Sequence, residues 1–191
     1  MTAAGSYLAH EAGHLAGVAG DRIGQWARWG HIQASISTGD PHVYAFADVA
    51  EAIAVHDLLD RGLTLPAIRR AVEELGGPVG WPLSRSGLHV VHGRLAVERG
   101  NELVELLGRG AQEILPLDGR LDPLATLRRG GWPSRALGLT SVEVDPGRLG
   151  GRPALRDRRI AVTDAVTLDD PEEHGLEPHL LEEARAWLQP V

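Results

Sequence analysis

The sequence of 191 residues predicts an α+β fold that begins with a winged helix-turn-helix domain. Two observations support this prediction. Between residues 7 and 75, apolar side chains recur at helical spacing in four short segments that turn-forming residues separate. Beyond residue 77, short runs of valine and leucine alternate with glycine-containing turns, which is typical of β-hairpins. We expect three domains, over residues 1–76, 77–141 and 142–191.

The first domain is expected to open with two helices joined by a turn. Gly17 is expected to end the first helix, which starts near Tyr7. The second helix is expected from Asp21 to Gly30, with Asp21 as its cap because neither serine nor threonine stands directly before it. The inner faces of these two helices are predicted to consist of Leu8, Ala12, Leu15, Ala16, Ile23, Trp26 and Ala27.

A wing and two further helices are expected to complete this domain. Residues 31–37 and 42–44 flank the turn-rich residues 38–41, which predicts a two-stranded hairpin. Asp48 is expected to cap a third helix, and Thr64 a fourth. Four short helices and a hairpin in this order are the parts of a winged helix-turn-helix.

Four spaced motifs run through these elements. They are Ala12-x-x-Leu15-x-Gly17-Val18, Trp26-x-x-x-Gly30, Tyr44-x-Phe46-x-Asp48 and Gly62-x-x-Leu65. With them, residues 7–75 resemble the DNA-binding region of the MerR regulator family. The resemblance implies that the helix around residues 22–28 enters the major groove of DNA and that the wing lies on the phosphate backbone.

The resemblance also implies which residues contact DNA. They are Arg22, Gln25, Trp26, Arg28, His31, His42 and Tyr44. Two positions depart from the family pattern, because Gly24 and His42 stand where the family carries arginines. Residues 1–76 hold five arginines against nine acidic residues, which is unfavourable for neutralising phosphates. A scaffold that no longer binds DNA is therefore an alternative.

A second motif falls on the first predicted helix. Residues 10–14 read His-Glu-Ala-Gly-His, the HExxH pattern that places two zinc-binding imidazoles one helical turn apart in zinc peptidases. Catalytic zinc also needs a third protein ligand and an open position for water. The loose candidates for that third ligand are His31, His42, Glu51 and His56. We expect His10, Glu11 and His14 on the solvent side of the helix with no metal bound, and a zinc hydrolase is the least favoured alternative.

Composition narrows the function classes. The chain has no cysteine, so it has neither disulfides nor a thiolate nucleophile, which fits a reducing cytoplasm. No apolar run approaches the ~18 residues of a membrane helix, and the N-terminus lacks a signal pattern. We therefore expect a cytoplasmic protein without a membrane partner or a cofactor. Residues 142–191 hold six arginines and eleven acidic residues, a balance that suits a basic protein partner and would also follow from solubility alone.

The middle region is expected to be rich in β-hairpins. A breaker-rich link over residues 76–82 precedes it. The expected elements are a hairpin of residues 88–91 and 95–98, a third strand over 102–107 whose composition also suits a helix, and a short helix over 123–127. His89 and His92 are expected on the strand surface. This region shows no catalytic constellation, and we predict no enzyme activity.

The C-terminal domain is expected to combine two strands with helical pieces. A Gly150-Gly151 turn joins the strands, and Gly175 interrupts the helices. The final helix, over residues 178–188, carries an apolar face of Leu180, Leu181, Ala184, Trp187 and Leu188.

Three motifs of this domain give a second resemblance. They are Gly151-Arg152-Pro153, Arg159-Ile160-x-Val162 and Gly175-Leu176. With them, residues 142–190 resemble domain-of-unknown-function family 433, found among VapB-like antitoxins. The resemblance implies a helix-turn-helix-like C-terminal domain and a PIN-like ribonuclease as the toxin. The Gly-Thr-Arg of the family is replaced here by Asp157-Arg158-Arg159.

Several arginines of this domain are candidates for partner binding. They are Arg152, Arg156 and Arg159, and nearby acidic residues could instead satisfy them locally. The leading hypothesis is a DNA-binding transcriptional regulator that acts as the antitoxin of a toxin–antitoxin pair, as a homodimer or hetero-oligomer on its own promoter. The alternative is a protein-binding toxin inhibitor that does not touch DNA.

Overall fold

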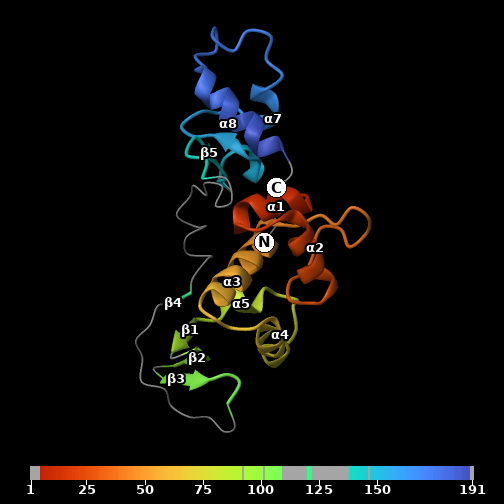
Figure 1. Ribbon diagram of the computed structural model, residues 1–191, viewed down its shortest axis with the longest axis vertical. Coiled ribbons are helices and arrows are strands. Elements are labelled where there is room, and N and C mark those ends of the chain that lie inside the picture. Colours follow the sequence, from red (N-terminus) through yellow and green to blue (C-terminus); the bar gives the residue numbers. More distant parts are fainter. Residues whose placement is uncertain are drawn as a thin grey trace.

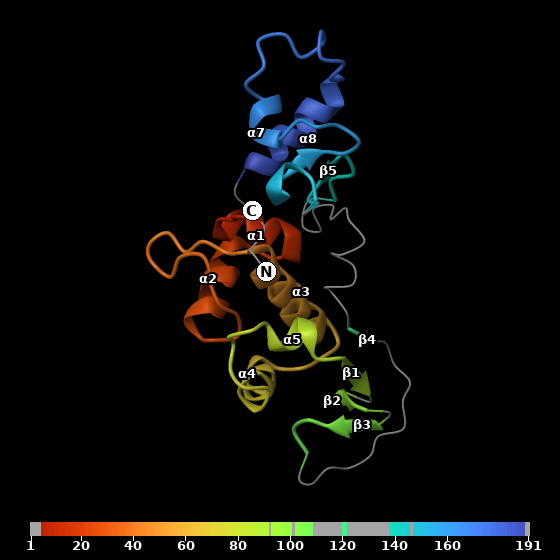
Figure 2. The ribbon, with the colours of Figure 1, turned by 180° about the vertical axis from the view of Figure 1, so that it is seen from behind.

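The computed structural model describes residues 5–91, 93–100, 102–108, 120–121, 138–145 and 147–189. Figure 1 shows an elongated arrangement with the N-terminal helices in the middle, a small sheet at one end and the C-terminal unit at the other. The view from behind shows the same order along the long axis (Figure 2). Both ends therefore attach to the helical domain of the first 75 residues.

Helices α1 (Ala9–Ala16) and α2 (Gly20–Arg28) are joined by a tight turn. Gly17 ends α1 with a φ of 77°, as predicted. The prediction that Asp21 caps α2 is wrong, because the helix begins one residue earlier and Ala19 occupies the N-cap position. The predicted inner faces are confirmed by the burial of Ala12, Leu15, Ala16, Ile23 and Trp26. Of the other two predicted residues, Ala27 is partly buried against the core and Leu8 is 39% exposed.

Two glycines allow α1 and α2 to approach closely. A Cβ atom on Gly13 would lie 2.5 Å from the carbonyl oxygen of Val18, and one on Gly20 would lie 2.9 Å from the Cα atom of His10. Side chains other than hydrogen cannot fit at such distances from backbone atoms. The close crossing of the two helices thus depends on Gly13 and Gly20.

A loop takes the place of the predicted two-stranded wing. Its pairing within the described residues consists of isolated antiparallel bridges, Ser37 with Val43 and Tyr7 with Tyr44. Residues 38–41 are exposed and contain the cis Asp40–Pro41 peptide bond. An exposed polar segment has no apolar face to bury, so it does not extend into a ladder. We call residues 37–43 the wing loop.

Helices α3 (Phe46–Asp60) and α4 (Leu65–Glu74) complete the helical domain. Asp48 was expected at the N-cap of α3, but Ala45 occupies that position. Asp48 instead lies in the first turn, where its Oδ2 atom accepts the Ala45 N–H at 2.8 Å. The start of α4 follows the prediction, because the Thr64 hydroxyl accepts a first-turn backbone N–H at 3.4 Å.

The link after α4 leads into a short helix, α5 (Pro82–Arg85), that packs on α3. The Trp81 indole N–H donates to Asp48 Oδ1 at 2.6 Å. Glu51 accepts two backbone N–H groups of α5, at 3.1 and 2.6 Å. Both carboxylates are fully buried, so α3 holds the beginning of the middle region through buried polar contacts.

The middle region forms an antiparallel sheet with the strand order β3-β2-β1-β4. The strands are β1 (Leu88–Val91), β2 (Arg94–Arg99), β3 (Glu102–Glu105) and β4 (Arg120–Leu121). The predicted hairpin is confirmed, and the third segment is a strand rather than a helix. The helix expected over residues 123–127 and the side chain of His92 lie outside the described residues.

The C-terminal unit contains two short strands and two helices. Its elements are β5 (Val142–Glu143), the 3-10 turn η1 (Leu149–Gly151), β6 (Ala154–Leu155), α7 (Val162–Ala165) and α8 (Pro178–Leu188). Gly175 lies between the two helices with a φ of 66°, as predicted. The α7 segment is a single turn, so the helix-turn-helix-like arrangement stays a prediction. Within the described residues, none of the helices has the length and apolar character needed to cross a membrane.

The C-terminal unit rests on α1 through a buried aromatic contact. The rings of His14 and Trp187 meet edge to face, with centroids 5.1 Å apart, and both side chains are fully buried. The Tyr7 hydroxyl donates a hydrogen bond to the carbonyl of Gly151. The prediction that His14 faces solvent is therefore wrong, because α8 covers that side of α1.

Candidate nucleic-acid interface

The outward face of α2 carries polar side chains predicted to contact DNA. Arg22, Gln25 and Arg28 are exposed and recur every third residue, which places them along one side of the helix. Ile23 and Trp26, by contrast, are fully buried in the core of the domain. The core thus sets the rotation of α2 and directs the three polar side chains away from the domain.

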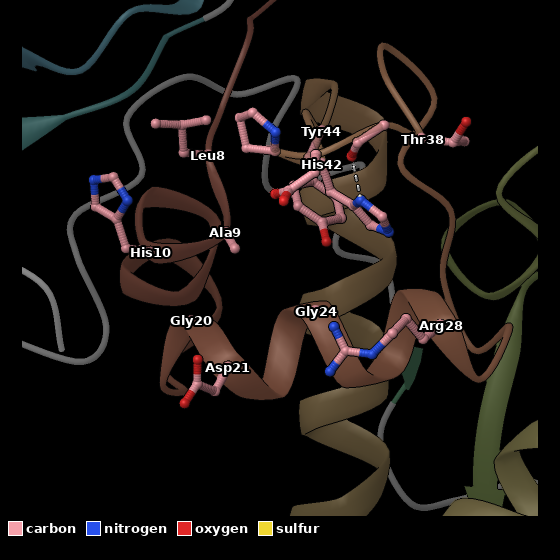
Figure 3. Close-up of a pocket in the computed structure, with 13 residues that line it drawn as sticks. Leu8, Ala9, His10, Gly20, Asp21, Gly24, Arg28, Thr38, His42 and Tyr44 are labelled. Carbon is pink, nitrogen blue, oxygen red and sulfur yellow. Dashed lines mark hydrogen bonds between the residues drawn. The ribbon is translucent and has the colours of Figure 1, made fainter.

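An open groove of about 900 Å³ runs between α2, the start of α1 and the wing loop (Figure 3). We call it the α2 groove. Figure 3 shows His10 and Asp21 toward one end of it and Arg28 and His42 toward the other. The α2 groove therefore brings together side chains from α1, α2 and the wing loop, which are separate segments of the sequence.

The α2 groove is lined by residues of both charges and by two histidines. Arg28 supplies a permanent positive charge, and Asp21 and Asp40 supply two negative charges. His10 and His42 are the bases among the described residues that line the groove. The net charge of the groove depends on these two imidazoles.

The orientation of His42 follows from one hydrogen bond. Its Nδ1 atom lies 2.7 Å from the carbonyl oxygen of Gly39. A carbonyl oxygen only accepts, so Nδ1 carries the hydrogen and donates it. The Nε2 atom is left as the second functional position of the ring.

Gly24 leaves an open place on α2. A Cβ atom there would meet only the Nη1 atom of Arg28, at 3.3 Å. The residue lines the α2 groove, where the MerR resemblance implies an arginine. The geometry can accommodate a larger residue at position 24. Among the described residues that line the groove, the arginine is Arg28.

Three of the predicted DNA contacts are corrected by burial. Trp26 and Tyr44 are 0% exposed and His31 is 4% exposed, because they lie on the inner sides of α2 and of the adjoining loop. Burial raises the pKa of Tyr44 to about 12. Burial, together with the nearby Arg69, lowers the pKa of His31. These side chains pack in the core behind the outward face of α2 and are not accessible to a DNA duplex.

The HExxH string has structural roles in this chain. Glu11 Oε2 accepts the Leu8 N–H at 2.8 Å and so completes the first turn of α1. His14 lies under α8, and burial lowers the pKa of its imidazole. Of the three residues, only His10 reaches the α2 groove.

One exposed aromatic residue was not predicted as a contact. Trp29 ends α2 and is 51% exposed, with its ring edge-on to His31 at a centroid distance of 6.4 Å. It follows Arg28 directly, so it extends the outward face. The signal in the sequence is a large aromatic residue directly after Arg28, a predicted DNA contact.

The predicted partner-binding arginines have local acidic neighbours. Arg152 contacts Asp164 at 2.9 Å, and Arg156 lies 3.6 Å from Glu143. Arg159 is exposed. The local pairing that the sequence left open is thus found for two of the three residues.

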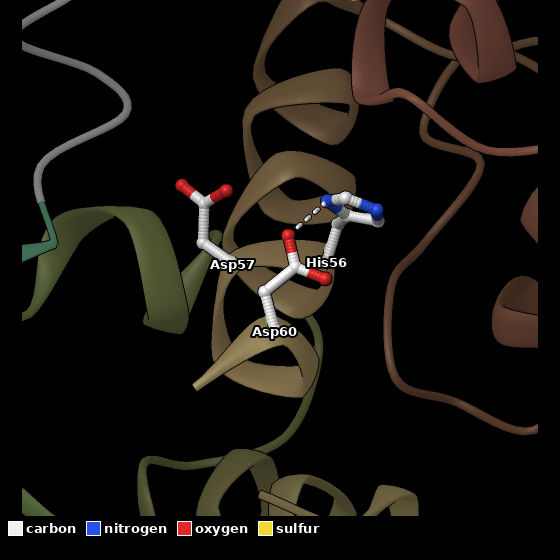
Figure 4. Close-up of side chains that lie close together, drawn as sticks. All are labelled: His56, Asp57 and Asp60. Atoms are coloured by element: carbon white, nitrogen blue, oxygen red, sulfur yellow. Dashed lines mark ion pairs between the residues drawn. The ribbon is translucent and has the colours of Figure 1, made fainter. Parts of the chain in front are cut away.

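A cluster of potential metal ligands lies on α3. His56 Nδ1 is 3.3 Å from Asp60 Oδ2, and Asp57 lies beside them (Figure 4). All three come from neighbouring positions of one helix, so water would have to complete any coordination shell. We assign no metal role to this cluster.

Comparisons with known proteins support the assignment of the first domain. Residues 7–75 match the family described as "MerR HTH family regulatory protein". These residues therefore form a MerR-family helix-turn-helix domain, the type found in DNA-binding regulators.

The whole chain was also compared with solved structures and curated proteins. It is similar to the X-ray crystal structure of Rv2018 from Mycobacterium tuberculosis, with 17% identity and a TM-score of 0.45 over 94% of this chain and 96% of that one. These values support no conclusion about function. The comparison with curated proteins finds no match.

Proposed function

We propose that this protein is a DNA-binding transcriptional regulator that reads DNA with α2. The observation that carries the proposal is the exposed row of Arg22, Gln25 and Arg28 on a helix whose other side is locked in the core of a MerR-family domain. In helix-turn-helix proteins such a helix lies in the major groove. Arginine and glutamine side chains can then reach base edges or phosphates.

Substitution of the two arginines tests this role. Changing Arg22 and Arg28 to Ala should weaken binding to the DNA upstream of the gene by about 1–3 kcal/mol for each base-reading contact. A gel shift titrated with salt measures both the affinity and the number of phosphates neutralised. Arg99→Ala is the matched control, because it removes an exposed arginine from β2 instead of α2. Equal binding by the double variant and the control would refute the role of α2.

We further propose that the regulator acts as an antitoxin. Support comes from the resemblance of residues 142–190 to VapB-like antitoxins and from the acidic balance of residues 142–191. In this proposal the C-terminal unit binds a PIN-like ribonuclease and covers its active site. Its attachment to α1 would link toxin binding to the DNA-binding domain.

The product of the neighbouring gene is the test of the antitoxin role. Expression of a ribonuclease-like neighbour alone should arrest growth, and co-expression of this chain should restore it. Arg22 and Arg28 should be dispensable for that rescue, because they lie on the DNA-binding face. A neighbour that is harmless, or that fails to co-purify with this chain, would leave a regulator without an antitoxin role.

The number of copies on DNA is part of the proposal. Two half-sites favour a twofold assembly, so we expect a dimer or a toxin-bound hetero-oligomer. The link after α4 is short and rich in glycine, and α5 follows it. A dimer contact would therefore use the sheet or the C-terminal unit, and cross-linking on a two-site duplex would detect it.

One observation favours the alternative of a protein-binding inhibitor without DNA binding. Asp21 and Asp40 line the α2 groove and repel phosphates. Absence of binding to any duplex at low salt, together with intact toxin inhibition, would establish that alternative.

A further inference from the structure

We propose that His10 and His42 make the α2 groove a proton-dependent seat for a DNA phosphate backbone. The groove accepts the backbone when both imidazoles are charged and repels it when both are neutral. This inference rests on the proposed function, because it concerns how the same face binds DNA.

The summed charge of the residues that line the groove changes sign when both imidazoles are protonated. With neutral imidazoles, Arg28 stands against Asp21 and Asp40, so the lining residues sum to a charge of −1. With both imidazoles charged, the sum is +1. A phosphate carries a negative charge, so its interaction with the groove changes from repulsive to attractive.

Neighbouring groups do not cancel this change. On α1, Glu11 is hydrogen-bonded to Leu8 and His14 is buried beneath α8. Tyr44 lies beside His42 and stays neutral, because burial raises its pKa to about 12. His10 and His42 are therefore the lining residues whose protonation changes the charge of the groove.

Protonation also changes which hydrogen bonds His42 can make. Its Nδ1–H is committed to the Gly39 carbonyl at 2.7 Å. In the neutral ring, Nε2 can only accept, and phosphate oxygens also only accept. Protonation places a hydrogen on Nε2 and converts the ring into a charged donor. His42 can thus bind phosphate as an imidazolium and not as a neutral imidazole.

The size of the effect follows from counterion release. Each additional phosphate that is neutralised steepens the dependence of log K on log salt by ~0.9. Histidines change charge between about pH 5 and pH 8. Lowering the pH from about 8 to about 6 should therefore steepen the slope by ~1–2 and tighten binding at low salt by roughly tenfold or more.

The experiment uses the full chain and two DNA samples of equal length. One is the duplex from upstream of the gene, and the other is a pool of random-sequence duplexes, which depends least on base reading. Fluorescence anisotropy at about pH 6 and about pH 8, over several salt concentrations, gives both the affinity and the salt slope. Wild-type protein should bind both samples more tightly and with a steeper slope at the lower pH.

Three variants assign the effect to the groove. The double variant His10→Gln, His42→Gln should bind with nearly the same affinity at both pH values, because neither position can gain a charge. His42→Arg should bind more tightly than wild type at about pH 8, because the position is then always charged. His174→Gln changes an exposed histidine of the C-terminal unit and should keep the full pH dependence.

The possible failures are distinct. Binding that is equally tight at both pH values, or pH dependence that survives in the double variant, overturns this inference and leaves the proposed function standing. Failure to bind either DNA sample at the lower pH and low salt overturns the proposed function, and this inference falls with it.

Discussion

Asp48 and Glu51 are fully buried acidic residues that connect three segments of the chain. Asp48 accepts hydrogen bonds from Ser35, Ala45 and Trp81, and Glu51 accepts two from α5. Buried carboxylates are tolerated when their oxygen atoms have donors, and removal of one leaves those donors unsatisfied. At the residue scale, these two side chains hold the wing-side loop and the middle region to α3.

Glu51 should make the stability of the protein depend on pH. Burial raises the pKa of Glu51 to about 7, against the opposing effect of the hydrogen bonds from Ser84 and Leu83. The folded state therefore holds the proton more tightly than the unfolded state. Its stabilising contribution is complete below about pH 4.5 and is lost as the pH rises toward 7. We expect a loss of up to about 3 kcal/mol across that range.

Urea denaturation at several pH values measures this contribution. The difference between wild type and Glu51→Gln isolates the group from all other titrations. Glu74→Gln serves as the control, because Glu74 is exposed on α4. Parallel pH profiles for wild type and Glu51→Gln would contradict the assignment.

Glycines have opposite meanings in α1 and α2 at the scale of the element. Gly13 lies where the turn backbone approaches to 2.5 Å of a hypothetical Cβ atom, whereas Gly24 faces the open groove. Gly13 thus allows α1 to pack closely against the following turn, whereas Gly24 leaves space for a larger side chain on the surface of α2. Sequence alone does not distinguish the two, because both interrupt an amphipathic pattern.

Replacement of each glycine by alanine should therefore have opposite effects. Gly24→Ala should stabilise the fold by about 0.5–1 kcal/mol, because alanine restricts the unfolded chain and improves helix propensity. Gly13→Ala should destabilise it by roughly 2 kcal/mol or more, because the new methyl group overlaps the Val18 carbonyl and forces the crossing apart. Thermal denaturation of both variants under one set of conditions measures the contrast. A stable Gly13→Ala variant would show that the helices can separate at little cost.

The whole molecule depends on how its C-terminal unit is attached. That unit contacts α1 through the buried pair His14 and Trp187 and through the Tyr7–Gly151 hydrogen bond. An aromatic contact that contains an imidazole is sensitive to protonation, because burying the charged ring is costly. The attachment is therefore expected to weaken in acid.

Acidification should loosen the C-terminal unit before the helical domain. Burial lowers the pKa of His14, with a further contribution from His10, so the folded state favours the neutral ring. The stabilising contribution of a group of this kind is present above its unfolded pKa of about 6.5 and is lost as the pH falls through the lower, folded value. Hydrogen exchange should show faster opening of α8 than of α3 at low pH. His14→Phe should remove the difference, and an unchanged exchange pattern in that variant would refute this role of His14.

Local signals predicted most of the helical domain. The alternation of apolar and polar positions located α1 to α4, Gly17 and Thr64 marked their ends, and the motifs of residues 7–75 indicated the MerR-family domain that the comparison supports. The same signals gave the hairpin of β1 and β2. These features depend on neighbours within a few residues, which a sequence displays directly.

Only the tertiary structure decided which of the predicted contact residues reach the surface. Trp26, His31 and Tyr44 belong to the core, whereas His10, taken from the HExxH string, joins Arg28 and His42 at the α2 groove. The burial of His14 likewise depends on α8, which comes more than a hundred residues later. The sequence by itself determined the helices and the class of the first domain, because local patterns encode them. The groove and its charge arose only when distant segments packed together, because burial and electrostatic proximity are properties of the folded chain.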